Sequence, residues 1–434
     1  MVRPPGDKSI SHRVLMLAAL ARGTSELDGL LTGADVKSTA RVLRQVGAEI
    51  SVVTPGRTVR VRGSRFHAPG DRLDCGNSGT TARLGLGLLA GHPFAATLTG
   101  DASLRRRPMR RVTEPLRAMG AEIRDERGDA LPLTIRGGRL HALSYTTPVA
   151  SAQVKSALLF AGLTGRVAVT VREPYRSRDH TERLFVHLGL PLHERDGAIA
   201  YEPPEGPSVV PAFHLAVPGD ASSAAFLVAA AALAEAGELV VENVNVNPTR
   251  TGFLVVLARM GAPVERVNLR DAGGEPVADL VARPAPLRGT EITAAEIPTL
   301  VDEVPILAVL ASRAMGETVF REVGELRVKE SNRLELIAAN LRAVGSVAEA
   351  RGNDLFVCGS PHAPRGRVDT ARDHRLAMAF AVLGGVPGAA VRLSERASVV
   401  ISYPTFFRDL QRIGERAERG KGKRTAAGAR VEAG

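Results

Sequence analysis

Two kinds of helical segment alternate along the chain. Residues 14–21 and 226–230 are apolar at almost every position, which predicts helices that are buried on all sides. Residues 36–46 and 335–344 carry polar residues on one face, which predicts amphipathic helices. Segments typical of β-strands, such as 96–99, lie between the two kinds. The pattern therefore predicts an α/β fold in which strands and amphipathic helices shield apolar helices.

This alternation recurs at a spacing of roughly 70–80 residues, which is longer than the period of short solenoid repeats. Each recurrence opens with a polar loop directly before the apolar helix. The loops begin near Gly6, Gly76, Ala150, Gly219, Asp302 and Asp373. Six such units predict two domains of three units each, and we expect the opening loops to gather at one cleft between the domains.

The hinge between the domains is expected at residues 209–217, a short extended run near Pro211 and Pro218. The predicted domains are 6–210 and 211–413, and residues 1–5 are expected with the second domain, at the crossover. The remaining residues, 414–434, are rich in Gly, Ala, Lys and Arg without periodicity, which predicts a disordered basic tail.

Composition narrows the class of ligand. The formal net charge of +11 over 434 residues suits a polyanion, and it suits small phosphorylated substrates equally. Nucleic acid is the weaker choice because Trp is absent, aromatic residues make up 4% of the chain, and no recognition motif appears. We therefore expect small anionic substrates and no nucleic acid.

The number of cysteines and the hydropathy of the chain indicate where in the cell the protein is expected. Cys75 and Cys358 are too few for a disulfide framework or a cysteine-based zinc site. No apolar run reaches the length of a membrane span, and the first residues lack the apolar region of a signal peptide. We expect a soluble cytoplasmic protein that does not bind membranes.

The most informative loop is 75–84, a run of small residues that leads into an apolar segment. Ser and Thr are natural helix N-caps, and glycine lets a ligand approach the backbone closely. The helix that follows should present N–H groups and the positive end of its dipole to an anion. A capped helix start alone is weak evidence, but variants of this loop recur at the other unit starts.

Cations outnumber carboxylates at the predicted unit starts. Arginine suits bidentate capture of phosphate or carboxylate, and the few acids there could transfer protons. Taken singly, each of these side chains is more often a solvated surface group. Their joint placement predicts a site for one or more small polyanions.

Competing motifs fit less well. Residues 6–9 imitate the end of a phosphate-binding P-loop but lack its earlier glycine. His180 near Glu182, and His374 near Asp373, suggest metal binding, but no spacing supplies a third ligand. We expect neither a metal ion nor an organic cofactor.

Four segments together resemble a known family. They are 5–13 (PGDKSISHR), 76–84 (GNSGTTARL), 327–334 (RVKESNRL) and 373–378 (DHRLAM). Each is similar to a signature of the 5-enolpyruvylshikimate-3-phosphate (EPSP) synthase family, and the resemblance runs from about residue 4 to about residue 413. It implies the inside-out α/β barrel of enolpyruvyl transferases, with three βαβαββ units in each of two domains that close over substrate.

The resemblance also implies a reaction. The carboxyvinyl group of phosphoenolpyruvate moves to the 5-hydroxyl of shikimate 3-phosphate and phosphate is released, a step of aromatic amino-acid synthesis. The two substrates carry two phosphates and two carboxylates, which matches the excess of cations at the unit starts. We expect these small molecules as the only partners, and a monomer.

Roles for individual residues follow from the resemblance. The catalytic residues would be Asp302 as general base, Glu330 for proton exchange at C3, and Lys8 for departure of phosphate. Shikimate 3-phosphate would be held by Lys8, Ser9, Arg13, Ser151, Ala152, Gln153, Arg178, Asp302 and Lys329. Phosphoenolpyruvate would be held by Lys8, Gly79, Arg107, Gln153, Arg333 and Arg375. How the protons are divided among the three catalytic residues stays open.

The chain departs from the common family pattern at three positions. Ala152 replaces a second serine, so a contact there must use the backbone. Asn332 replaces an acidic residue, which predicts a looser orientation of Arg333. Ile401 replaces a lysine, which removes one expected phosphate contact. The chain also begins almost at the first signature, and we expect the natural start to lie upstream.

Two other functions stay open on the sequence. The UDP-N-acetylglucosamine enolpyruvyl transferases share the implied fold, but they usually carry a cysteine at roughly the place of residues 105–107, which contain none. A basic nucleic-acid-binding protein acting through residues 421–424 is the alternative of another class.

Overall fold

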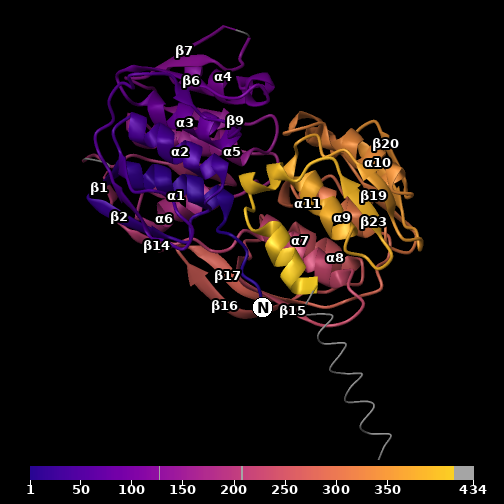
Figure 1. Cartoon of the computed structure of the whole chain (residues 1–434). Helices are drawn as coiled ribbons and strands as arrows, with labels where there is room; N and C mark the ends of the chain where they lie inside the picture. Colours follow the sequence, from indigo (N-terminus) through magenta and orange to yellow (C-terminus); the bar gives the residue numbers. More distant parts are fainter. Residues whose placement is uncertain (127, 207–208, 415–434) are drawn as a thin grey trace, which may run out of the picture. The chain divides into compact units, whose positions relative to one another are not determined.

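The computed structural model describes residues 1–126, 128–206 and 209–414. It shows an α/β chain that divides into two compact units. The N-terminal unit consists of Pro5–Pro218 with Asp271–Pro276, and the C-terminal unit consists of Met1–Pro4, Gly219–Arg270 and the chain from Val277. Figure 1 shows most of the N-terminal unit in indigo to magenta and the later part of the C-terminal unit in orange to yellow.

Three apolar helices form the centre of the N-terminal unit, and three further helices carry polar faces. The apolar helices are α1 (Lys8–Leu20), α3 (Gly79–Ala90) and α5 (Ala152–Gly165). The others are α2 (Ala34–Gln45), α4 (Arg110–Ala118) and α6 (His180–His187), with a short 3-10 helix, η1 (Leu104–Arg106).

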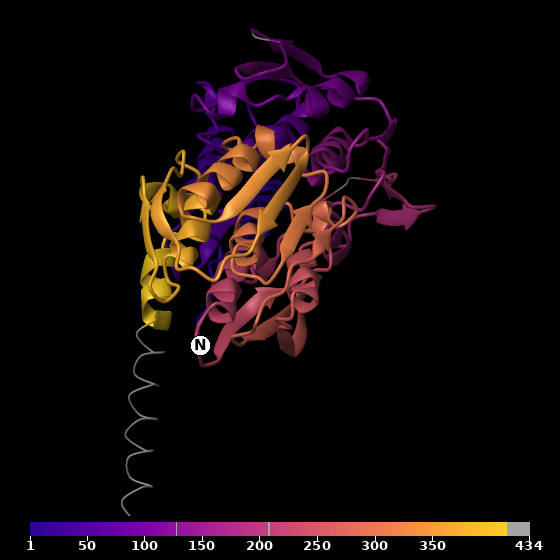
Figure 2. The ribbon, with the colours of Figure 1, turned by 90° about the vertical axis from the view of Figure 1, so that its right-hand side faces the viewer.

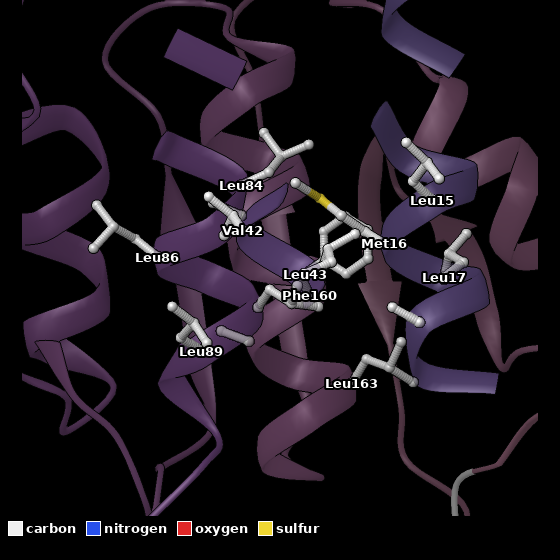
Figure 3. Packing of buried hydrophobic residues seen from close by; sticks show 14 of the residues in the cluster. Leu15, Met16, Leu17, Val42, Leu43, Leu84, Leu86, Leu89, Phe160 and Leu163 are labelled. Atoms are coloured by element: carbon white, nitrogen blue, oxygen red, sulfur yellow. The ribbon is translucent and has the colours of Figure 1, made fainter. Parts of the chain in front are cut away.

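Glycines let α3 and α5 pack backbone to backbone. A Cβ added at Gly87 would lie 2.0 Å from the carbonyl oxygen of Ala157, and one at Gly91 would lie 2.3 Å from the backbone nitrogen of Gly165. Side chains from α1, α2, α3 and α5 meet in the surrounding core, with Met16 and Phe160 near its centre (Figure 3). This packing brings the starts of the helices close enough to share hydrogen bonds.

Four sheets cover these helices, with strand orders β1-β13, β14-β2-β4-β3, β5-β6-β8-β7 and β11-β12-β10-β9. In each four-stranded sheet one pair is parallel and the rest are antiparallel. The strands are β1 (Ala21–Arg22), β2 (Thr24–Asp28), β3 (Glu49–Ile50), β4 (Val59–Arg62), β5 (Leu73–Asp74), β6 (Ala95–Thr99), β7 (Glu122–Asp125), β8 (Leu133–Arg136), β9 (Leu143–Thr146), β10 (Val169–Arg172), β11 (Leu192–Arg195), β12 (Ala198–Tyr201), β13 (Val210–Pro211) and β14 (His214–Ala216).

The C-terminal unit has a similar helix content. Its apolar helices are α7 (Ala221–Ala232), α9 (Val304–Ala311) and α11 (His374–Leu383), and α8 (Gly252–Arg259) and α10 (Arg333–Ala343) pack beside them. All eight residues of α9 are buried. The 3-10 helices are η2 (Ile297–Thr299), η3 (Gly324–Val328) and η4 (Ala397–Ile401).

Three sheets belong mainly to this unit, in the orders β15-β17-β16, β18-β19-β21-β20 and β22-β23. Figure 2 shows the orange strands of this unit in front of its helices. The strands are β15 (Leu239–Asn245), β16 (Glu265–Ala272), β17 (Glu275–Ala282), β18 (Glu291–Ile292), β19 (Glu317–Phe320), β20 (Val347–Arg351), β21 (Asp354–Cys358), β22 (Arg365–Val368) and β23 (Ala390–Leu393).

The structure confirms the predicted elements. The apolar helices begin within a few residues of the six predicted loop starts, and 36–46 and 335–344 correspond to α2 and α10. The strand expected at 96–99 is β6. These segments were predictable because hydrophobic periodicity depends on local sequence alone.

The division into units differs in detail from the predicted one at residue 210. β13 pairs with β1 and β14 pairs with β2, so the run 209–217 is part of the N-terminal unit rather than a free linker. Residues 1–4 join the C-terminal unit, where the backbone of Val2 bonds to Val240 and Glu242. Such long-range strand pairing leaves little trace in composition.

The predicted barrel and the predicted basic tail are not seen in the described residues. Among the strands that the structure describes, no sheet closes on itself, so the barrel in the predicted fold class is not observed. The predicted basic tail, 414–434, lies outside the described residues except for Gly414. Within the described part of the chain, every helix is too short or too polar to span a bilayer.

Candidate active site

Lys8 stands at the first turn of α1. The side chain of Asp7 caps this helix by accepting from the backbone nitrogen of Ile10 at 3.0 Å. The Lys8 Nζ lies 3.4 Å from a carboxylate oxygen of Asp35, and both side chains are mostly buried. The capped helix start and the lysine therefore place positive charge at one point of the N-terminal unit.

Arg107 lies over the start of α3. Ser78 caps this helix by accepting from the backbone nitrogen of Thr81 at 3.1 Å. A Cβ added at Gly79 would meet Nη1 of Arg107 at 3.5 Å, and the guanidinium donates to Asn77 at 2.7 Å. The absence of a side chain at Gly79 thus leaves space next to a buried guanidinium.

Arg83 connects α3 to α5. Its Nη1 donates to Oε1 of Gln153 at 2.8 Å, and its Nη2 donates to the carbonyl of Pro108 at 3.1 Å. Gln153 in turn donates to the hydroxyl of Thr80 at 3.0 Å. These bonds fix the orientation of Gln153, which the sequence analysis predicts to bind substrate.

The start of α5 is organised by Glu173. Ser151 caps the helix, and its backbone nitrogen donates to Glu173 at 2.8 Å. The other carboxylate oxygen of Glu173 lies 2.7 Å from Nζ of Lys155, which also lies 2.6 Å from Glu182. Burial would lower the pKa of Lys155, but the charges of Glu182 and Glu173 outweigh burial and raise that pKa.

Arg13 reaches from α1 to α5 and α6. Its guanidinium donates to Thr181 at 2.7 Å, to Ser156 at 2.7 Å and to the carbonyl of Ser9 at 2.9 Å. Burial lowers the pKa of Arg13 to about 10, although Glu182 and Asp7 oppose this. The charge of Arg178 also lowers the pKa of Arg13.

We call the predicted site residues of this unit, together with Arg83, the N-terminal cluster. Its members are Lys8, Ser9, Arg13, Gly79, Arg83, Arg107, Ser151, Ala152, Gln153 and Arg178. Arg13, Arg83 and Arg107 donate to hydroxyl, amide or carbonyl oxygens, and Lys8 pairs with the carboxylate of Asp35. A cluster of this kind on three helix N-termini suits binding of phosphates and carboxylates.

A second group surrounds Asp302, between η2 and α9. One carboxylate oxygen lies 3.5 Å from Nη1 of Arg333, and the other lies 3.6 Å from Nη2 of Arg375. Arg375 also donates to the backbone carbonyl of Asp302 at 3.0 Å. Opposite charges at these distances favour the ionised carboxylate.

Arg333 is almost fully buried and bound by carboxylates. Its Nε and Nη2 donate to the two oxygens of Asp373 at 2.8 and 3.2 Å, and Nη2 also pairs with Glu330. Burial would lower the pKa of Arg333, but Asp373 and Glu330 raise it well above its ordinary value. Burial would raise the pKa of Asp373, but Arg333 lowers it.

We call this group the C-terminal cluster. Its members are Asp220, Ser222, Arg250, Asp302, Glu303, Glu330, Arg333, Asp373 and Arg375. Five of them are carboxylates and three are guanidiniums, so the cluster is rich in acids compensated by arginine. Such a group suits proton transfer in a fixed geometry.

The predicted site residues divide between the two clusters, and within each unit the structure brings most of them together. Lys329 is the exception, because its Nζ lies 2.7 Å from Glu325 on the partly exposed side of η3. The expected loosening of Arg333 by Asn332 is wrong. Arg333 is oriented by Asp373 and Glu330, whereas Asn332 caps α10 by accepting from Glu335.

Sequence reasoning missed Arg83 and Arg250. Arg83 stands inside a recognised segment, and its position one turn after Thr80 was the available signal. Arg250 follows the polar run Asn245–Thr249 directly before α8, a loop like those that open the units. Neither could be paired with its partners from sequence alone.

Comparison with solved structures first defines the class of fold. The chain resembles the enolpyruvyl transferase NikO from Streptomyces tendae with a TM-score of 0.73 over 95% of this chain and 94% of that one, at 19% identity. It resembles EPSP synthase from Acinetobacter baumannii with a TM-score of 0.83 over 94% of each chain, at 37% identity. The fold is therefore that of enolpyruvyl transferases.

Sequence comparison then defines the family. The family described as EPSP synthase (3-phosphoshikimate 1-carboxyvinyltransferase) matches residues 1–410. Proteins named 3-phosphoshikimate 1-carboxyvinyltransferase are 52% identical in Thermus thermophilus, over 95% of this chain and 96% of the relative, and 48% identical in a Synechococcus, with the same coverage. The chain belongs to the EPSP synthase family.

Proposed function

We propose that the protein transfers the carboxyvinyl group of phosphoenolpyruvate to the 5-hydroxyl of shikimate 3-phosphate. The products are 5-enolpyruvylshikimate 3-phosphate and inorganic phosphate. Membership of the EPSP synthase family over residues 1–410 is the observation that carries this proposal. The reaction belongs to the shikimate pathway of aromatic amino-acid synthesis, and we place the protein in the cytoplasm as a monomer.

The N-terminal cluster binds the anionic groups of both substrates. Lys8, Arg107 and Gln153 hold phosphoenolpyruvate beside Gly79, and Arg13 and Ser151 hold shikimate 3-phosphate. Ser9, Ala152, Arg178 and Lys329 complete the shikimate 3-phosphate site, with Ala152 acting through its backbone N–H. The positive helix ends support this role because N–H groups there have no intrahelical partner.

The C-terminal cluster transfers protons. Asp302 accepts the proton of the 5-hydroxyl, and the oxygen of that hydroxyl forms a bond to C2 of phosphoenolpyruvate. In the same step, C3 gains a proton from Glu330. The tetrahedral adduct then loses a methyl proton to Glu330, and the bond from C2 to the phosphate oxygen breaks. Lys8 stabilises the departing phosphate, and Arg333 and Arg375 bind phosphoenolpyruvate.

The proposal includes the arrangement of the two clusters. It assigns both clusters to the same two substrates. The six-unit organisation is also proposed, and the alternation of apolar and amphipathic helices from α1 to α11 supports it. No metal or organic cofactor takes part.

The experiment measures phosphate release from phosphoenolpyruvate with two acceptors in parallel. We expect turnover with shikimate 3-phosphate and none with UDP-N-acetylglucosamine, the acceptor of the related cell-wall enzymes. Detection of 5-enolpyruvylshikimate 3-phosphate by mass spectrometry identifies the product. Turnover with the nucleotide sugar alone would contradict the proposed acceptor.

A further inference from the structure

Arg250 is a buried cation to which the sequence signatures assign no role. It lies between β15 and α8 with a side chain 2% exposed. Its Nη2 donates to the hydroxyl of Ser222 at 2.8 Å and lies 3.9 Å from Asp220, and its Nη1 lies 4.0 Å from a carboxylate oxygen of Asp302. Burial of a guanidinium is costly unless such partners compensate it.

The turn that carries Arg250 is fixed by its own hydrogen bonds. The side-chain oxygen of Asn247 accepts from the backbone nitrogen of Thr249 at 2.9 Å and from its hydroxyl at 2.8 Å. The backbone carbonyl of Asn247 accepts from the backbone nitrogen of Arg250 at 2.8 Å and from the hydroxyl of Thr251 at 3.2 Å. The arginine is therefore presented to Asp302 from a rigid turn.

The balance of charge around Asp302 depends on this residue. The guanidiniums near Asp302 include Arg250, Arg333 and Arg375, and the ionisable groups close to these arginines include Asp220, Glu303, Glu330, Asp373 and His374. Arg333 is shared with Asp373 and Glu330, and Arg375 is shared with Glu303 at 3.8 Å. Removal of Arg250 therefore takes one guanidinium away from Asp302.

We propose that Arg250 is a positioning residue that keeps Asp302 ionised and in place to accept a proton. The inference rests on the proposed function, because it concerns the general base of that reaction. Arg250 itself touches neither substrate. It acts on Asp302 through charge and, through Ser222 and Glu303, on the start of α9, since the Ser222 hydroxyl donates to Glu303.

The test is the pH dependence of kcat for Arg250→Met, which keeps an unbranched apolar stem and removes the charged guanidinium. A base works only when ionised, so activity falls on the acid side as the base becomes protonated. Loss of a nearby cation raises the pKa of Asp302, so the acid limb should move to higher pH by about one unit. The Arg250→Lys variant keeps the charge, and its acid limb should stay close to that of the parent protein.

A purely structural role gives a different result. If the acid limb of Arg250→Met stays at the parent position while activity changes equally at every pH, the inference is overturned. If the Arg250→Met variant does not fold, the double variant Asp220→Asn/Arg250→Met replaces it in the test. The double variant removes one positive and one negative charge together. Asparagine keeps the cap that Asp220 gives to α7 by accepting from Ser223. Its acid limb should move in the same direction by a smaller amount, and an unmoved limb again overturns the inference.

Failure of the proposed function is distinguishable from failure of this inference. Asp302→Asn with parental turnover would remove Asp302 as the general base, whatever Arg250 does. If Asp302→Asn is inactive and Arg250→Met keeps the parental acid limb, the base stands and the role of Arg250 falls. Binding of shikimate 3-phosphate, measured by calorimetry, should be the same for Arg250→Met and the parent.

Discussion

The two clusters differ in how they hold their most buried arginines. In the N-terminal cluster, Arg13 donates to the hydroxyls of Thr181 and Ser156 and to the carbonyl of Ser9. In the C-terminal cluster, Arg333 forms ion pairs with Asp373 and Glu330, so carboxylates compensate its charge. The first arrangement suits capture of anions, and the second keeps acids in defined protonation states.

In the proposed function, the N-terminal cluster mainly binds anions, and the C-terminal cluster contains the residues that transfer protons. A helix N-terminus with a neutral cap attracts a phosphate whatever the pH. A carboxylate between guanidiniums stays ionised and can accept a proton from a substrate hydroxyl. Substitutions in the C-terminal cluster should therefore lower kcat, whereas substitutions in the N-terminal cluster should raise KM.

The largest effect is expected in the C-terminal cluster. Asp302→Asn removes the proposed base and keeps the shape of the side chain, so kcat should fall by about a thousandfold. Binding of shikimate 3-phosphate should persist, because the proposal assigns its phosphate to the N-terminal cluster. Steady-state kinetics and calorimetry measure the two quantities, and loss of binding with unchanged kcat would reverse the assigned roles.

The next effect concerns the N-terminal cluster. Arg107→Leu removes a charged hydrogen-bond donor, so KM for phosphoenolpyruvate should rise roughly 10- to 100-fold. The exposed neighbour Arg105 offers a matched control, and Arg105→Leu should leave KM close to the parent value. Equal effects of the two changes would mean that general surface charge, and not the cluster, binds the substrate.

A smaller effect is expected at Gly79, beside the same arginine. In this family the herbicide glyphosate competes with phosphoenolpyruvate, and the resemblance implies that Gly79 leaves room for it. The Cβ of Gly79→Ala would lie 2.9 Å from Nη1 of Arg83, so the inhibition constant of glyphosate should rise about tenfold.

Gly85→Ala is the control for this change. It adds the same methyl group to α3, where the nearest atom is a methyl of Leu98 at 3.5 Å. Its glyphosate inhibition constant should match that of the parent protein. An unchanged constant in Gly79→Ala would show that the inhibitor does not approach this turn.

The smallest effect concerns the stability of the N-terminal unit in mild acid. Burial, with the charges of Lys8 and Arg13, holds the pKa of His12 well below its ordinary value of 6.5. The unfolded chain therefore binds a proton below about pH 6.5 that the folded unit does not, so stability falls by up to about 1.4 kcal/mol per pH unit.

Hydrogen exchange of α1 amides at pH 7 and pH 5.5, corrected for intrinsic rates, measures this loss of stability. His12→Asn should lose part of the dependence, because asparagine does not titrate there. Replacement of the exposed His187 by asparagine is the control. A pH dependence that His12→Asn leaves intact would assign the loss of stability to other groups.

Much of the fold was predictable because its helices are defined by local patterns. The apolar run of α9 and the Ser and Asp caps of α3 and α11 are visible in the sequence. The positions of β13 and β14 were not predictable, since each pairs with a strand almost two hundred residues earlier. Strand pairing of that range depends on tertiary packing.

The candidate site was predictable where residues belong to a contiguous segment. Lys8, Gly79 and Glu330 stand in such segments, and their neighbours in sequence are also their neighbours in space. Arg250 lies in no such segment, and its proximity to Asp302 arises only when α7, α8 and α9 pack together. Residues that act through a partner are therefore the ones that sequence reasoning misses.

The central claim is that both clusters contact the same bound substrates. Hydrogen exchange with and without shikimate 3-phosphate and glyphosate tests it most directly. The account predicts added protection at the starts of α1, α3 and α5 and, in the same complex, around residues 302–304, 329–333 and 373–375. Protection confined to one of the two units would contradict a shared active site.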